Sequence, residues 1–579
     1  MLSSIVPFFL FLLALVRAVD PLVDLTYAKY QGQTLQNGVN QWLSIRFAAP
    51  PTGTLRSSAP QAPPAENSTQ DATKEGALCV SANNQGRLQF NSPRQRMAED
   101  CLFFAIYASL NATTDPKLPI MFFIQGGSFS SNSNGNFNGT GLVQASGMNM
   151  IVVRTNYQVR ILGFIGGSLV DADGEGAVPN NGLNDSVYCS STWVKQHATK
   201  FGGNPDHIVT RGDSSGGNAP DILLTANNGA GFPDLFVGAA AEIDRDGSFA
   251  KNINSTGCLN ATDPIDCMRM MPIAEFQNKT AKDGWGPIID GKILTAPYYQ
   301  MIEQGKFQKI PVIYGTASNE ATPDFISNQS ATTDPDLEKH IRDTVGHSIT
   351  PLKSKQCYSL PPTPIPKQHF LLQPHRLSSP RNSALCKGSG PQWQRDAAIM
   401  TELKLTCVAA FFSDIYASGN VPANYHYRYN ILDPTLADQG IFTSHTRELY
   451  AIWGPNNTDG EDPKCFKTPA DSVGCKESIS IVQSYWISFI RSLDPNTFRA
   501  AGAPLWEPWS IAVPKRIVFD NKDATMEVMG QGVGEVLLAG LGQRASCNGP
   551  VLPLSKAVNA GNWGLSISVL VFAAFYFLL

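Results

Sequence analysis

The segment Ile208–Asn218, with the sequence IVTRGDSSGGN, constrains the fold of this chain more than any other segment. A β-branched run leads into Gly212-Asp213-Ser214-Ser215-Gly216, and a helix is expected from Ser215 to Ala226. In the pattern G-x-S-x-G, glycines permit a sharp strand-to-helix turn that lifts the serine clear of a sheet. Ser214 is therefore the candidate nucleophile. An ordinary glycine-rich turn has a similar composition. Whether Ser214 is a nucleophile therefore depends on whether the chain also supplies a base and an acid.

A catalytic serine needs a base that takes its proton, and a carboxylate usually orients that base. In hydrolases with a strand–turn–helix serine, the carboxylate and then the histidine follow the serine along the chain. This order excludes His197 and His207. His426 lies within an alternating aromatic strand and is expected to be a strand side chain. His445 follows the loop after that strand, directly before a helical run at Leu449–Trp453, and is the candidate base.

Two further apolar runs predict strands, and the loops after them carry a candidate carboxylate and candidate backbone N–H donors for the site. The run Ile310–Tyr314 predicts a buried strand, and Glu320 is the first carboxylate on the loop after it. The run Ile120–Ile124 leads into Gln125-Gly126-Gly127-Ser128-Phe129. This composition is typical of the glycine-rich loop whose backbone N–H groups stabilise an oxyanion in esterases.

Other motifs extend along most of the chain: Arg46-Phe47-Ala48-Ala49-Pro50-Pro51-Thr52-Gly53, Glu99-Asp100-Cys101-Leu102, Asn156-Tyr157 with Leu162-Gly163-Phe164, Gly182-Leu183 with Asp185, Trp193-Val194, Phe201-Gly202-Gly203-Asn204-Pro205, and Asp290-Gly291. Together they resemble the type-B carboxylesterase, lipase and cholinesterase family of the α/β-hydrolase superfamily, and its secreted fungal members in particular. The resemblance implies an α/β fold with a large, mostly parallel central sheet, helices on both faces and long insertions.

The resemblance also implies roles for individual residues. Ser214 would be the nucleophile, Glu320 the acid and His445 the base. The oxyanion would be bound by backbone N–H groups of Gly127, Ser128 and Ser215, and no cofactor or metal would be needed. The disulfides implied by the family pattern are Cys79–Cys101 and Cys258–Cys267.

The chain departs from the family pattern at the elbow and at the oxyanion loop. Asp213 and Ser215 stand where Glu and Ala are usual, and neither change removes a backbone donor. Ser128 stands where a third glycine is usual, so its N–H survives while its Cβ narrows the oxyanion hole. Cholinesterases bind a quaternary ammonium on a tryptophan between the first disulfide cysteines. No tryptophan lies between Cys79 and Cys101, so a choline preference is not expected.

The chain has eleven cysteines, and disulfides are expected in a secreted protein. Cys465 and Cys475 are close enough in sequence to pair locally, and the family's late disulfide suggests Cys407 with Cys547. Three cysteines are left over, and none has metal-ligand spacing with histidine: Cys189, Cys357 and Cys386.

Both ends of the chain resemble processing signals. Residues 1–18 contain an apolar core and end in Ala18, which predicts a signal peptide. Residues 19–555 would form the hydrolase domain. Residues 556–579 end in an uncharged apolar run and resemble a GPI-attachment signal, with a tail-inserted membrane helix as the alternative. Nine N-x-S/T sequons add modest support for secretion. The protein is thus expected at the cell surface or wall, with membrane contact only through a lipid anchor.

One segment, Lys353–Gln394, is rich in Pro, Gln and Ser and has no periodicity. Two interpretations remain open: a long surface loop near the site entrance, and translated intron sequence.

The sequence therefore predicts a serine carboxylic-ester hydrolase that acts on a small-molecule or lipid ester through an acyl-enzyme. The net charge of −4 offers no basic surface for nucleic acid. A secreted triacylglycerol lipase is the alternative enzyme, although the Cys79–Cys101 segment is polar for a lipase lid. A non-catalytic adhesion protein on the same fold is the alternative of another class, and competent residues at all three triad positions argue against it. The oligomeric state is not predicted.

Overall fold

The computed structural model describes residues 18–529 apart from 83–87, 90–96, 114–116, 133–136, 167–169, 171–175, 189–192, 233–234, 243–255, 259, 281–285, 323–329, 331–332, 334–335, 337–338, 341–392, 422, 439–440, 459–462, 464–465 and 467–474. Several predictions fall outside these residues. They are the signal peptide up to residue 17, the segment 353–392, the tail 556–579, and the cysteines Cys189, Cys357, Cys386, Cys465 and Cys547.

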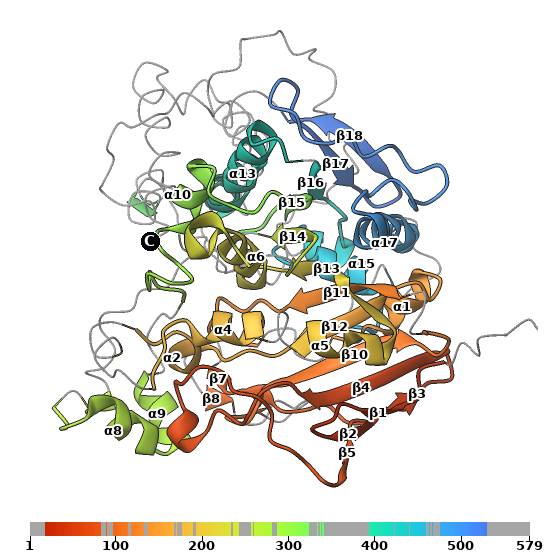
Figure 1. Ribbon diagram of the computed structural model, residues 1–579. Coiled ribbons are helices and arrows are strands. Elements are labelled where there is room, and N and C mark those ends of the chain that lie inside the picture. Colours follow the sequence, from red (N-terminus) through yellow and green to blue (C-terminus); the bar gives the residue numbers. More distant parts are fainter. Residues whose placement is uncertain are drawn as a thin grey trace, which may run out of the picture.

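An eleven-stranded sheet forms the centre of the molecule (Figure 1). From one edge to the other its strands are β18 (Ala524–Val528), β17 (Lys515–Phe519), β16 (Asn424–Tyr429), β15 (Val312–Ala317), β14 (Gly238–Glu242), β13 (Gly203–Gly212), β11 (Leu118–Ile124), β12 (Ile151–Thr155), β10 (Phe103–Ser109), β4 (Val39–Arg46) and β3 (Gln33–Thr34). Neighbours from β17 to β12 pair in parallel, and the strands outside them pair antiparallel. The sheet is therefore mostly parallel, as predicted.

Helices cover both faces of this sheet (Figure 1). On one face lie α6 (Ser215–Thr225), α10 (Tyr298–Glu303) and α13 (Cys407–Ser418), whose apolar side chains share a core with Ile120, Phe122 and Ile124 of β11. On the other face lie α1 (Thr140–Ala145), α15 (Glu448–Trp453) and α17 (Cys475–Ser492), which share a second core with Met121 and Phe123. Successive side chains of a strand point to opposite faces, so a strand covered on both sides is apolar throughout.

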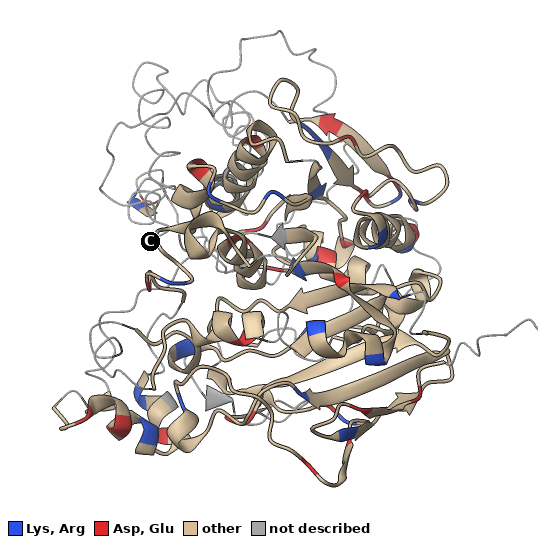
Figure 2. Cartoon of the chain, viewed as in Figure 1, with Lys and Arg blue, Asp and Glu red and all other residues tan. Residues whose placement is uncertain are grey.

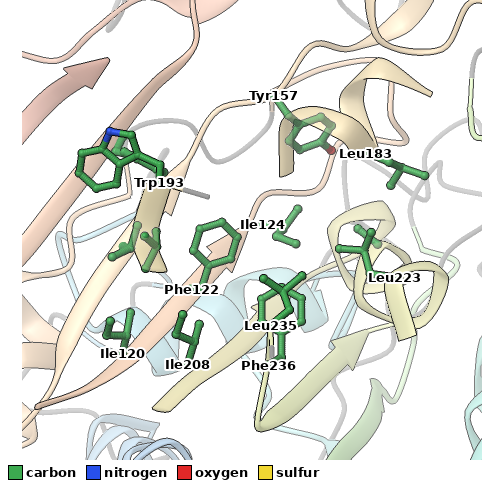
Figure 3. Packing of buried hydrophobic residues seen from close by; sticks show 14 of the residues in the cluster. Ile120, Phe122, Ile124, Tyr157, Leu183, Trp193, Ile208, Leu223, Leu235 and Phe236 are labelled. Atoms are coloured by element: carbon green, nitrogen blue, oxygen red, sulfur yellow. The ribbon is translucent and has the colours of Figure 1, made fainter. Parts of the chain in front are cut away.

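The first of these cores is drawn in Figure 3. Ile120, Phe122 and Ile124 follow one another along β11, with Ile208 of β13 beside them and Leu223 of α6 to the right of Ile124. Tyr157 lies near the Ile124 end, where the strand leads into the glycine-rich loop.

Smaller elements surround the sheet. Near the N-terminus, β1 (Leu22–Asp24), β2 (Lys29–Gln31) and β5 (Thr69–Asp71) form a separate three-stranded sheet. Two short strand pairs follow, β6 (Leu78–Cys79) with β9 (Met97–Ala98) and β7 (Ser81–Ala82) with β8 (Leu88–Gln89). The remaining helices include α2 (Arg160–Gly163), α4 (Asn181–Val187), α5 (Lys195–His197), α8 (Pro264–Met270), α9 (Ile273–Thr280), α12 (Trp393–Thr401) and α14 (Pro434–Asp438).

The elements predicted around the site lie close to their predicted positions. The helix expected at Ser215–Ala226 ends at Thr225, and the helix expected from Leu449 begins one residue earlier, at Glu448. The strand expected at Ile310–Tyr314 is displaced toward the C-terminus, since β15 runs from Val312 to Ala317. Pro311 directly precedes this strand, and because proline has no N–H to donate to a neighbouring strand, it favours a strand start at the next residue.

Charged residues are dispersed around the molecule, and few of them lie on the central strands (Figure 2). Within the residues that the structure describes, no helix is long and apolar enough to cross a membrane.

Candidate active site

Ser214 occupies a strained turn between β13 and α6. Its backbone has φ 54° and ψ −132°, a left-handed φ that a serine rarely adopts. The turn is tight enough that a Cβ on Gly212 would lie 1.8 Å from the carbonyl oxygen of Gly216, so this position admits no side chain. Strained residues of this kind persist where the surrounding structure fixes them, and they cluster at functional sites.

Parallel pairing brings the three predicted triad residues to one edge of the sheet. Ser214 follows β13, Glu320 follows β15, and His445 lies on the loop after β16. The carboxyl ends of parallel strands share an edge, where α/β proteins place their ligands. The loops that carry Glu320 and His445 are joined directly, because the Asn319 N–H donates to the Thr443 carbonyl at 2.9 Å.

Glu320 and His445 contact each other through their side chains. The distance from His445 Nδ1 to Glu320 Oε2 is 2.6 Å. The other oxygen, Glu320 Oε1, accepts a hydrogen bond from the Ala317 N–H, and the glutamate side chain is fully buried. Burial raises the pKa of Glu320, and the neighbouring imidazole of His445 opposes that rise. With Nδ1 directed at the carboxylate, Nε2 is the nitrogen that remains to exchange a proton with a substrate or a nucleophile.

The glycine-rich loop after β11 packs directly against the serine turn. A Cβ on Gly126 would lie 3.0 Å from the Cβ of Ser214. The Gly126 N–H donates to Asp213 Oδ1 at 3.3 Å, and the Phe129 N–H donates to Ser215 Oγ at 3.1 Å. The two elbow residues that depart from the family pattern, Asp213 and Ser215, thus hold the loop through their side chains, a role that the sequence did not reveal.

The backbone of this loop is left-handed over three consecutive residues. Gly127, Ser128 and Phe129 have φ values of 120°, 54° and 54°. Glycine tolerates such values, whereas a serine and a phenylalanine are strained there. Phe129 is buried and Ser128 is exposed. The side chain of Ser128 therefore lies at the surface of the loop.

A buried ion pair lies beside Glu320. Arg211 of β13 and Glu448 of α15 are almost fully buried, with 3.8 Å between Arg211 Nη2 and Glu448 Oε1. The guanidinium lies over the rings of Phe123 and Trp486. The charge of Glu448 contributes to the raised pKa of Glu320. Glu448 is the first residue of α15, and its side chain is buried because the first turn of this helix faces β13.

Two other histidines have distinct environments. His426 is a buried side chain of β16, as predicted, with its ring 4.9 Å from that of Trp509, and burial lowers its pKa well below the usual range. His340 forms a second histidine–carboxylate contact, 2.8 Å from Nδ1 to Oδ1 of the buried Asp396. That pair was not predicted.

Both disulfides that the family resemblance implied are present, Cys79–Cys101 and Cys258–Cys267. The second joins a small apolar cluster formed with α2, α8 and α9. Cys475 is also disulfide-bonded, and its predicted partner Cys465 lies outside the described residues. In the described part of the chain, no group of three or more His, Cys, Asp or Glu side chains is arranged to hold a metal ion.

A model of the carboxylesterase family matches residues 19–528. The chain belongs to the carboxylesterase family. It is therefore a carboxylic ester hydrolase, and its sheet and helices are those of the α/β-hydrolase fold.

Individual relatives of this carboxylesterase carry different names. A para-nitrobenzyl esterase of Bacillus subtilis is 26% identical over 520 residues, which cover 86% of this chain and 95% of the relative. The secreted triacylglycerol lipase LIP1 of Gibberella zeae is 24% identical over 508 residues, with 79% of this chain and 80% of the relative covered. The crystal structure of Aspergillus niger EstA superposes with a TM-score of 0.74 at 30% identity, over 89% of this chain and 97% of EstA.

Proposed function

We propose that this carboxylesterase cleaves esters through a triad of Ser214, His445 and Glu320 and through an acyl-enzyme intermediate. The observation that carries the proposal is the 2.6 Å contact between His445 Nδ1 and the buried Glu320, on loops at the same sheet edge as the strained Ser214 turn. A base oriented by a carboxylate at the end of the strands is what an otherwise weak serine nucleophile requires.

In the first half of the reaction, Ser214 Oγ attacks the ester carbonyl carbon while His445 Nε2 takes its proton. Glu320 holds the imidazole in the tautomer whose Nε2 lone pair accepts the proton, and it stabilises the imidazolium that forms. The imidazolium then gives the proton to the leaving alkoxide, and the acyl group stays on Ser214.

In the second half, water replaces the alcohol. His445 takes a proton from the water as it attacks the acyl carbonyl, and returns that proton to Ser214 when the acid leaves. In both halves the negative carbonyl oxygen would be bound by backbone N–H groups of Gly127, Ser128 and Ser215. Such preorganised donors supply about 3–4 kcal/mol each in hydrolases of this kind.

The substrate is an ester, and two proposals differ in the length of its acyl chain. We favour small or soluble esters, because the segment between Cys79 and Cys101 is polar, whereas a lipase lid needs an apolar inner face. A triacylglycerol lipase is the second proposal, supported by the name of the Gibberella zeae relative. A series of p-nitrophenyl esters from acetate to palmitate separates the two: soluble-ester preference predicts a maximum of kcat/KM at short chains, and a maximum at long chains above the solubility limit supports the lipase.

Secretion is part of the proposal, with attachment to the cell surface through a GPI anchor. The apolar N-terminal segment and the name of the Gibberella zeae relative support secretion, and the uncharged apolar run at 565–579 supports the anchor. Release of active protein from intact cells by a phosphatidylinositol-specific phospholipase C is expected. Protein that remains bound after this treatment contradicts the anchor.

The triad is tested by comparing two histidines that each contact a buried carboxylate. His445→Ala should lower kcat for p-nitrophenyl butyrate by several orders of magnitude, as should Ser214→Ala. His340→Ala is the matched control, since it also breaks a histidine–carboxylate contact, and it should retain activity. Loss of activity in His340→Ala with activity kept in His445→Ala would reverse the assignment. A folded wild-type protein without activity on any ester would favour the non-catalytic adhesion protein.

A further inference from the structure

Behind the glycine-rich loop lies a buried network of three neutral amide side chains: Gln125, Asn132 and Asn156. Gln125 is the residue that joins β11 to Gly126, so its position sets where the loop begins. Its Nε2 donates to Asn132 Oδ1 at 2.6 Å and to Asn156 Oδ1 at 3.3 Å. The backbone of the same residue is held as well, because the Tyr157 hydroxyl donates to the Gln125 carbonyl at 2.8 Å.

The far side of this network reaches the first disulfide. Asn132 Nδ2 donates to the Cys79 carbonyl at 3.1 Å. Asn156 Nδ2 donates to the Cys101 carbonyl at 3.2 Å and to the Ala77 carbonyl at 3.0 Å. The disulfide keeps the Cα atoms of Cys79 and Cys101 4.9 Å apart, and so fixes the spacing of the two carbonyls that the asparagines bind.

We propose that Gln125, Asn132 and Asn156 are positioning residues, which transmit the rigidity of the Cys79–Cys101 disulfide to the oxyanion loop. The inference rests on the proposed function, because it assigns a role to the donors of that site.

The glycine-rich loop has a strained backbone, and the amide network would hold it in place. Three consecutive left-handed residues, Gly127 to Phe129, relax unless neighbouring structure holds them. A donor displaced by about 1 Å loses much of its catalytic value, since electrostatic stabilisation depends on placement before the reaction begins. Buried amides with their hydrogen bonds made are rigid, and they carry no charge that would alter the pKa of the triad.

The first experiment removes the donors of Gln125 without adding a charge. Gln125→Met has a similar shape and loses both Nε2 hydrogen bonds, and Asn132→Ala breaks the link at its next step. Each should lower kcat for p-nitrophenyl butyrate by about 10–100-fold with KM nearly unchanged, less than the loss of a whole donor. The affinity for an aryl trifluoromethyl ketone, which forms a serine-bound oxyanion, should fall by the same factor, and the pH profile of kcat should not move.

Asn424→Ala is the matched control. Asn424 is also a buried asparagine whose Nδ2 donates to a backbone carbonyl, that of Ser413, but it lies at the start of β16, away from the site. It should lose stability without losing affinity for the ketone. If Gln125→Met and Asn132→Ala behave like this control, the three residues are structural and the proposal is wrong.

A double-mutant cycle tests the link to the disulfide. In the Cys79→Ala/Cys101→Ala variant, Asn132→Ala should cost less than about threefold in kcat, because the rigid support is already gone. An equal cost with and without the disulfide contradicts the link. If the cysteine variant does not fold, the ketone affinity of Gln125→Met decides. Failure of the proposed function is distinct, because Ser214→Ala would then keep its activity and its affinity for the ketone.

Discussion

The two sides of the site, one with Glu320 and His445 and the other with the glycine-rich loop, contain different kinds of buried polar groups. The acid–base side contains charges: Glu320 with His445, and Glu448 with Arg211. The oxyanion side contains one carboxylate, Asp213, which accepts from the Gly126 N–H. Its other side-chain support comes mainly from neutral amides that exchange hydrogen bonds with one another and with backbone carbonyls. On the acid–base side, neither Glu448 oxygen accepts a hydrogen bond among the described residues. The difference matches the chemistry: one side must change its charge state, and the other must stay fixed.

On the acid–base side, each buried charge depends on the opposite charge next to it. Removing one member of a buried ion pair leaves the other uncompensated, and that costs more than the pair contributes. The neutral amide network of Gln125, Asn132 and Asn156 should respond to substitutions through geometry alone.

Glu320→Gln keeps the shape of the acid and removes its charge. It should lower kcat by about 10³–10⁴-fold with the fold intact, because the imidazolium loses its counter-charge and its tautomer is no longer fixed. The rate of acylation, measured by stopped flow with a p-nitrophenyl ester, checks this. Near-wild-type acylation in Glu320→Gln would remove this glutamate from the triad.

Glu448→Gln tests whether the Glu448 carboxylate stabilises the fold or takes part in catalysis. It should destabilise the protein by about 3–5 kcal/mol, because Arg211 would stay buried without a counter-charge. The kcat should change by less than about tenfold, since Glu448 does not contact His445 in the proposed mechanism. Urea unfolding and steady-state kinetics measure the two effects. If Glu448→Gln loses more activity than Glu320→Gln, Glu448 is the acid.

Asp221 of α6 is a buried carboxylate with a neutral partner, the Tyr314 hydroxyl, at 2.6 Å. Burial raises the pKa of Asp221 to about 7. The folded state therefore binds the carboxyl proton of Asp221 more tightly than the unfolded chain does. The resulting contribution to the free energy of unfolding is fully present at low pH and is lost as the pH rises from about 4 to about 7. The loss approaches about 4 kcal/mol for a shift of this size.

Asp221→Asn should abolish that part of the pH dependence, because an amide accepts the Tyr314 hydrogen bond at every pH. Urea midpoints measured below and above neutral pH provide the measurement. The exposed Asp206→Asn is the control and should keep the wild-type slope. A slope in Asp221→Asn equal to the wild type would show that Asp221 is ionised in the folded protein throughout this range.

Ser128→Gly should have the smallest effect on rate. The backbone N–H remains, so kcat for small esters should stay within about threefold, and bulkier acyl groups or tertiary alcohols should be accepted better because Cβ and Oγ are gone. Relief of the left-handed φ should add about 0.5–1 kcal/mol of stability.

Ser57→Gly is the matched control for this change. Ser57 also has a left-handed φ, 63°, and lies outside the site, so it should gain similar stability without a change in substrate range. If the hydroxyl of Ser128 donates to the oxyanion, Ser128→Gly would instead lose about 10²–10³ in kcat on all substrates.

The sequence predicted the parts of the site that local patterns determine. The glycines around Ser214 and the apolar runs before Glu320 and Gln125 are local signals, and chain order selected His445. Contacts between distant segments were not predicted. Asn132 binds the carbonyl of Cys79, 53 residues away, and neither residue carries a signal of the other. The six-residue α15 is too short for its periodicity to show which side chain faces the core, so the burial of Glu448 could not be predicted.

The most direct test of the account is the site of covalent labelling by a fluorophosphonate probe. Tryptic peptide mapping of the labelled wild-type protein should place the adduct on Ser214, and Ser214→Ala should take up no label. Labelling should slow in parallel with kcat in Glu320→Gln, because both need the activated serine. An adduct on another serine, or full labelling of Ser214→Ala, would contradict the assignment of Ser214 as the nucleophile.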